Sequence, residues 1–133
     1  MKVNELRIGN WVMNPNKLPV KIDSINHRGD ILLSNYEPWK VIVEDVSPLP
    51  LTKEILLKSG FETPKCNPAH EDVYARPVNY DYKIEPYFFI VDVSKKHIMV
   101  RRETELLCVK YQYVHELQNL WFELTKTEWR VKL

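Results

Sequence analysis

The segment Tyr113-Val114-His115-Glu116-Leu117-Gln118-Asn119-Leu120-Trp121-Phe122-Glu123-Leu124 decides the fold of this chain. Its apolar residues recur at the three- and four-residue spacing that places side chains on one face of an α-helix. Most of its polar residues fall on the other face, and neither Gly nor Pro interrupts it. The pattern therefore predicts the main core helix, with Leu117 and Leu120 buried and Leu124 one turn further on.

The residues before this helix have the composition of a β-sheet. Residues 87–93 form the run richest in β-formers, and turn residues Lys95 and Lys96 separate it from a return segment at 97–102. Residues 106–109 supply a further apolar run. We expect three or four antiparallel strands that the helix covers. After the helix, residues 129–133 alternate between apolar and charged, which predicts a last edge strand with its charges in water.

The N-terminal third predicts a second group of short strands. Residues 19–26 read as a strand with a bulge, because the apolar alternation slips by one position. Gly29 occupies the turn position that needs a positive φ, and residues 31–33 and 41–46 follow as return strands. Strands so short and close together favour a small antiparallel barrel of the Src-homology-3 type, with a meander packed on the rest of the protein as the alternative.

A short helix connects the two groups of strands. Thr52 is a good N-cap, Gly60 suits the left-handed position after the last turn, and Phe61 can fold back on Leu56. Residues 62–79 contain three prolines and no regular period, which predicts a long loop, with a brief strand near Val73 and Tyr74 as an alternative. The predicted class is α+β. A single domain over 1–133 is expected, with two lobes at 1–48 and 49–133 as the alternative.

Composition excludes several classes of protein. The chain carries 19 Lys and Arg against 18 Asp and Glu, so no overall charge attracts nucleic acid or anionic lipid. It has no apolar run of membrane-spanning length and no N-terminal apolar signal region. Its two cysteines lie far apart in the sequence, so no disulfide framework is implied. We expect a cytoplasmic protein with no membrane partner.

No arrangement of residues matches a known catalytic or metal-binding motif. Cys66, His70, Cys108 and His115 form an unfavoured Cys₂His₂ alternative, because strong zinc signals come as tight cysteine pairs. His115 could act as a base only with Glu116 or Cys108, and consecutive helix residues such as His115 and Glu116 point in different directions. With three glycines, the chain has no phosphate-cradling loop. The sequence leans against an enzyme and predicts no metal, cofactor or catalytic residue.

Five residues are candidates for binding. His115 and Asn119 are helix neighbours four residues apart that either fix the helix to adjoining loops or face a partner. Phe122 follows Trp121, so one of these two aromatic side chains leaves the main core face. It either anchors a ligand or a second subunit or packs against the long loop. The basic stretch 95–97 with Arg101 and Arg102 is the best candidate for nucleic-acid binding. Consecutive strand residues such as Arg101 and Arg102 face opposite ways, so a solvated turn is the favoured alternative.

Four sequence blocks resemble those of a family of small, uncharacterised proteins found in Bacteroidetes genomes and their phages and prophages. The blocks are residues 5–10 (ELRIGN), 50–52 with Leu56 and 60–61 (PLT, GF), 113–120 (YVHELQNL), and 124–125 with Glu128. The resemblance spans nearly the whole chain and implies a mobile-element origin, but no activity or site residues. The family often has Gly where this chain has Lys126, which questions the geometry of the helix exit.

Three functions follow as hypotheses. The leading one is a phage- or prophage-type accessory protein that binds a host protein or a second copy of itself. The second is a nucleic-acid-binding module that uses the N-terminal barrel or the basic residues Arg101 and Arg102. The third is binding or turnover of a small nucleotide-like ligand near the loop at 62–79.

Overall fold

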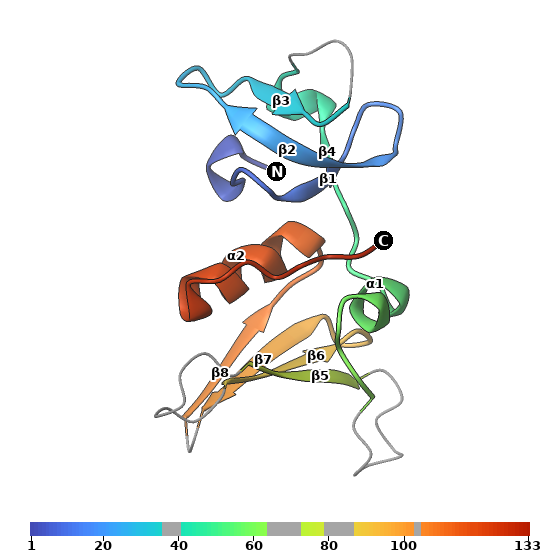
Figure 1. Cartoon of the computed structure of the whole chain (residues 1–133), viewed down its shortest axis with the longest axis vertical. Helices are drawn as coiled ribbons and strands as arrows, with labels where there is room; N and C mark the ends of the chain where they lie inside the picture. Colours follow the sequence, from blue (N-terminus) through green and yellow to red (C-terminus); the bar gives the residue numbers. More distant parts are fainter. Residues whose placement is uncertain (36–40, 64–72, 79–86, 103–104) are drawn as a thin grey trace. The chain divides into compact units, whose positions relative to one another are not determined.

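The computed structural model describes residues 1–35, 41–63, 73–78, 87–102 and 105–133 (Figure 1). The described residues form two four-stranded antiparallel sheets and two α-helices, which confirms the predicted α+β class. The chain divides into two compact units. The first unit contains residues 1–50 and 113–123, and the second contains residues 51–112 and 124–133.

The sheet of the first unit has the strand order β3-β2-β1-β4. Its strands are β1 (Trp11–Met13), β2 (Pro19–Ile25), β3 (Ile31–Leu33) and β4 (Ser47–Pro48), with short 3-10 turns at Val3–Glu5 (η1) and Val43–Asp45 (η2). The predicted bulge lies between Ile22 and Ser24. Gly29 has a φ of 83°, as the turn requires. Asn26 stabilises this turn, because its side-chain oxygen accepts hydrogen bonds from the backbone N–H groups of Arg28 and Asp30.

The predicted strand at 41–46 is replaced by a segment that touches both edges of this sheet. Val41 exchanges two backbone hydrogen bonds with Ile31 on β3, and η2 and β4 then bring the chain to β1. In the described residues the sheet itself is open. Its core is aliphatic and is formed by Leu6, Val12, Val20, Ile22, Ile31, Leu33, Val41 and Val46. Burial of these side chains is the main source of stability for the unit.

The sheet of the second unit is an antiparallel meander in chain order, β5-β6-β7-β8. The strands are β5 (Val73–Val78), β6 (Tyr87–Asp92), β7 (His97–Arg102) and β8 (Glu105–Lys110). Alternate residues of β5, β6 and β7 are buried on one face: Tyr74, Phe89, Val91, Ile98 and Val100. The long register, which runs from Asp92↔His97 to Phe88↔Arg101 in β6 and β7, keeps this face continuous.

Helix α1 (Lys53–Lys58) has the predicted ends. The Thr52 hydroxyl accepts a hydrogen bond from the N–H of Ile55 at 3.4 Å. Gly60 has a φ of 98°, and the N–H of Phe61 donates to the carbonyl of Leu56 at 3.0 Å. This is the bond that folds the chain back over the last helical turn. Phe61 is therefore buried.

Helix α2 (Val114–Thr125) confirms the predicted helix but not its predicted faces. Val114, Leu117 and Trp121 are buried, whereas Leu120 and Leu124 are only half-buried. Two residues from the predicted water-facing side, His115 and Gln118, are buried instead. Part of the polar face thus lies in the interior. Hydrogen bonds are made there, and a pattern of apolar residues cannot reveal them.

The C-terminal segment lacks the predicted edge strand, because no β-ladder includes residues 126–133. The alternation was nevertheless meaningful: Trp129 is buried, whereas Arg130 and Lys132 are exposed. Hydrogen bonds to Ser59, the residue after α1, replace the ladder. No helix in the described part of the chain is long and apolar enough to span a membrane.

Candidate functional site

The polar side of α2 binds the backbone of the N-terminal segment 5–11. The amide of Gln118 makes two bonds to this backbone: its oxygen accepts from the N–H of Trp11 at 2.8 Å, and its nitrogen donates to the carbonyl of Gly9 at 3.1 Å. Its oxygen also accepts a longer bond from Asn10 Nδ2 at 3.5 Å. Gln118 is 3% exposed. A buried amide is costly unless its groups are paired. Gln118 therefore acts like a short piece of added strand beside residues 9–11.

Asn119 makes three further bonds to the same segment. Its Nδ2 donates to the carbonyl of Glu5 at 2.7 Å. Its Oδ1 accepts from Asn10 Nδ2 at 2.9 Å and from Arg7 Nη1 at 3.1 Å. Asn10 is 1% exposed, and its own oxygen accepts from the N–H of Arg7 at 2.7 Å. Of the two roles expected for Asn119, the structure shows the one that fixes the helix to an adjoining segment.

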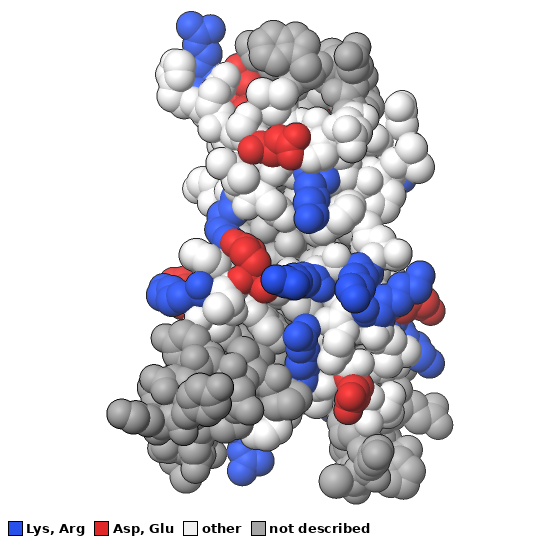
Figure 2. All heavy atoms as spheres, viewed as in Figure 1, with Lys and Arg blue, Asp and Glu red and all other residues white. Residues whose placement is uncertain are grey.

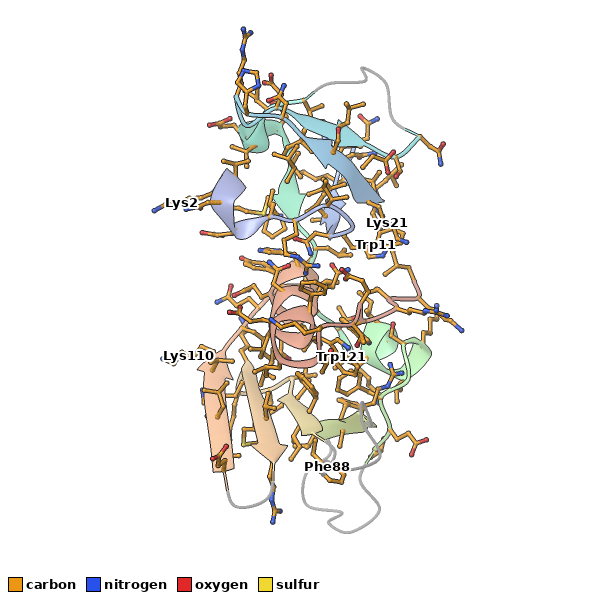
Figure 3. The ribbon with its side chains drawn as sticks, turned by 60° about the vertical axis from the view of Figure 1, so that its left-hand side comes forward. Lys2, Trp11, Lys21, Phe88, Lys110 and Trp121 are labelled. Atoms are coloured by element: carbon orange, nitrogen blue, oxygen red, sulfur yellow. The ribbon has the colours of Figure 1, made fainter. Side chains whose placement is uncertain are left out.

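Phe122 is also engaged within the first unit. The guanidinium carbon of Arg7 lies 4.1 Å from the centre of the Phe122 ring, which is cation–π geometry. Trp121 is the member of the aromatic pair that is buried, and Phe122 is half-buried. A second cation–π contact in the unit joins Lys21 and Trp11, whose ring centre lies 5.5 Å from Nζ (Figure 3).

His115 is buried and stacks on Tyr113, with ring centres 5.9 Å apart and planes 8° apart. Its Nδ1 has no hydrogen-bond partner within the described residues. Burial lowers the pKa of His115 below its usual value, while the nearby carboxylates of Glu116 and Glu5 oppose that change. Glu116 is occupied at the helix start, where Oε1 accepts from the N–H of Tyr113 at 3.1 Å. His115 is therefore a neutral ring in the interior.

The remaining predicted site residues are dispersed. Arg101 is exposed on β7, beside Phe88 and Leu106, and Arg102 follows on the same strand. The side chain of Arg102 lies outside the described residues. Cys66 and His70 of the unfavoured metal alternative also lie outside them, as does most of the loop at 62–79. Cys108 is exposed on β8. Among the residues that are described, no group of three or more His, Cys, Asp or Glu side chains could hold a metal ion.

The exposure of several apolar residues of the second unit was not predicted from the sequence. Leu106 and Leu107, on opposite faces of β8, are 63% and 44% exposed. Phe88 on β6, which is labelled in Figure 3, is 43% exposed. The register Phe88↔Arg101↔Leu106 places Phe88 and Leu106 on the same face of the sheet. The apolar run at 106–109 was visible, but a sequence does not state which strand lies at the edge of a sheet.

Comparisons with known proteins add no family to this description. No protein-family model, curated protein or solved structure matches the chain.

Proposed function

We propose that this chain is an accessory protein that acts by binding a protein partner, through the edge strand β8. The observation that carries this proposal is the exposure of Leu106, Leu107 and Cys108 on the last strand of a sheet. Edge strands are usually shielded by charges, bulges or covering segments. An apolar edge can instead add a strand from a partner, with backbone hydrogen bonds for affinity and side chains for specificity.

Because α2 is already engaged in contacts within the chain, β8 is a better candidate for the partner site than α2. Gln118, Asn119 and Phe122 already contact segment 5–11, so a partner that used them would have to break those bonds. The β8 surface requires no such exchange. Its charged ends, Glu105 and Lys110, flank the apolar residues, as the polar rim of an interface flanks its core. A host protein and a second copy of this chain are the two partners considered.

The experiment compares two matched double variants. Leu106→Lys/Leu107→Lys places two charges on the edge strand, and Leu18→Lys/Ile42→Lys places two charges at exposed apolar positions of the first unit. Sedimentation over a range of concentrations measures self-association, and a pull-down from host lysate measures a host partner. We expect the β8 variant to lose the complex and the control to retain it. A monomeric wild-type chain whose recovered proteins are the same with both variants contradicts the proposal.

Oxidative crosslinking identifies self-association through this edge. If two β8 strands pair, the exposed Cys108 of each copy comes near the other, so mild oxidation yields a covalent dimer. Cys108→Ser should abolish that dimer, because Cys66, the other cysteine of the chain, does not lie on β8. A dimer that persists in Cys108→Ser shows that another route, and not β8 pairing, produces it.

We also propose a phage or prophage origin, the host cytoplasm as the compartment, and a Src-homology-3-type barrel as the finer description of the first unit. The four sequence blocks support the origin, and a coding sequence located among phage genes tests it.

The segment 41–48 supports the barrel, since it contacts both β3 and β1. Closure predicts amide protons of residues 41–48 that exchange slowly, like those of β2.

A further inference from the structure

Four exposed cationic side chains of the second unit belong to two segments that are bonded together. Lys53 and Lys58 lie on α1, and Arg130 and Lys132 lie on the C-terminal segment. We name these four residues the cationic strip. On the face drawn in Figure 2, Lys and Arg side chains gather over the C-terminal segment and α1, whose positions Figure 1 gives.

Ser59, which follows Lys58, bonds the two segments. Its hydroxyl accepts from the N–H of Lys132 at 2.8 Å and lies 3.3 Å from the carbonyl of Lys132, to which it can donate. Its carbonyl accepts from Trp129 Nε1 at 3.2 Å and from Arg76 Nη1 at 2.8 Å. Ser59 is buried, so these bonds are shielded from water. These bonds place Lys132 next to Ser59 and therefore close to Lys58.

Trp129 orients the rest of the segment. Its ring is buried edge-on against Phe61, with centres 5.7 Å apart and planes 83° apart. With Trp129 inside, Arg130 and Lys132 both point outward. Two residues of extended chain span about 7 Å, so the two cations form a short row. The backbone that carries this row is held in place before any ligand binds, which lowers the entropic cost of binding.

The strip lacks internal neutralisation. None of its four cations makes an ion pair with a carboxylate in the part of the chain that the structure describes, although Glu54 lies one helical turn from Lys58. Fixed, unpaired cations at this density attract a polyanion more than a single small anion. The chain as a whole is nearly neutral, so this attraction is local to the second unit.

The residues around the cationic strip indicate which type of polyanion it binds. Single-stranded nucleic acid is bound on exposed aromatic rings. The strip has none, since Trp129 and Phe61 are buried. Stable binding to a lipid surface adds a buried apolar face to the electrostatic attraction of the cations. Helix α1 has six residues, and its apolar Ile55 and Leu56 are buried, which leaves Leu57 as its exposed apolar residue.

We propose that the cationic strip binds the phosphate backbone of a nucleic-acid duplex without sequence preference. Lys53, Lys58, Arg130 and Lys132 each contact a phosphate, and no base is read. This inference is independent of partner binding by β8, because the two surfaces share no residue. It also differs from a site at Arg101 and Arg102, which the tests below separate.

The test is fluorescence anisotropy with a labelled random-sequence DNA duplex at several salt concentrations, starting at 50 mM. Four phosphate contacts predict that log K falls with log salt with a slope of about −3.6. Arg130→Glu/Lys132→Glu should weaken binding at least about tenfold at low salt and reduce the slope to about −1.8. The control Lys2→Glu/Arg28→Glu changes the net charge equally in the first unit and should retain the wild-type slope.

Further measurements make each outcome decisive. The backbone of Lys132, not its side chain, bonds Ser59, so Arg130→Gln/Lys132→Gln should melt like wild type and still lose affinity. Equal weakening by the strip variant and the control overturns the proposal. If Arg101→Glu/Arg102→Glu loses binding and the strip variant does not, the proposal is overturned and Arg101 and Arg102 form the site instead. Tighter binding to a single strand, binding to anionic vesicles without duplex binding, or no binding at 50 mM salt also overturns it.

Discussion

At the scale of single residues, Gln118 and Asn119 matter most because their amides replace water for a whole backbone segment. Gln118→Ala leaves the N–H of Trp11 and the carbonyl of Gly9 without their partner, and Asn119→Ala removes an acceptor from the side-chain amide of Asn10, which is buried. Each change should lower the free energy of unfolding by about 1–3 kcal/mol. Glu123→Ala, on the exposed side of α2, is the control and should cost less than about 0.5 kcal/mol.

Chemical denaturation measures these three variants. Gln118 is the more deeply buried of the two amides, so its removal should cost at least as much as that of Asn119. If Asn119→Ala unfolds like wild type but loses a partner, its bonds to segment 5–11 contribute little and the helix face serves binding after all.

Lys126 shows how a residue type can conflict with a backbone conformation. It has a φ of 59°, in the left-handed region that side chains rarely adopt. A side chain in that region costs about 1–2 kcal/mol, and substitution by Gly removes this cost. Part of the resulting gain in stability is lost, because Gly has more conformational freedom in the unfolded chain. Lys126→Gly should therefore raise the free energy of unfolding by up to about 1 kcal/mol. Lys126→Ala is the control, since it removes the charge without relieving the backbone.

At the scale of elements, helix α2 is stabilised by an apolar row narrower than its sequence predicted. Leu117→Ala should cost roughly 2–5 kcal/mol, because a fully buried Leu loses transfer energy and leaves a cavity. Leu120 is half-buried, so Leu120→Ala should cost clearly less than Leu117→Ala. Thermal melting of both variants, recorded side by side, checks the order. Equal losses, or a larger loss for Leu120, would show that the helix is rotated from the orientation described here.

The elements also show what a sequence can and cannot predict. Thr52, Gly60 and Gly29 were predictable because their signals act within a few residues of the chain. The burial of Gln118 was not, because its partners are 107 and 109 residues away and hydrogen bonding leaves no periodic trace. The alternation at 129–133 correctly separated inward from outward side chains. It could not distinguish a ladder from an anchor, since Ser59 supplies its bonds from another element.

At the scale of the whole molecule, each unit carries a buried titratable group that contributes to the response to acid. In the first unit, burial lowers the pKa of His115. In the second, burial tends to raise the pKa of Asp92, but hydrogen bonds from Lys95 N and Ser94 Oγ outweigh it and leave the pKa below 3.8. Both groups are thus held in the state that binds fewer protons, so the unfolded chain takes up protons first.

The pH profile of stability should therefore fall in two stages. His115 contributes a loss that begins as the pH drops below about 6.5, its unfolded value, and Asp92 contributes a second loss below about 3.8. His115→Gln should flatten the profile between pH 5 and 7 and leave the lower stage unchanged. Asp92→Asn should do the reverse. Denaturation at fixed pH steps checks both, and a His115→Gln profile that still falls below pH 6.5 would show that another group controls the first stage.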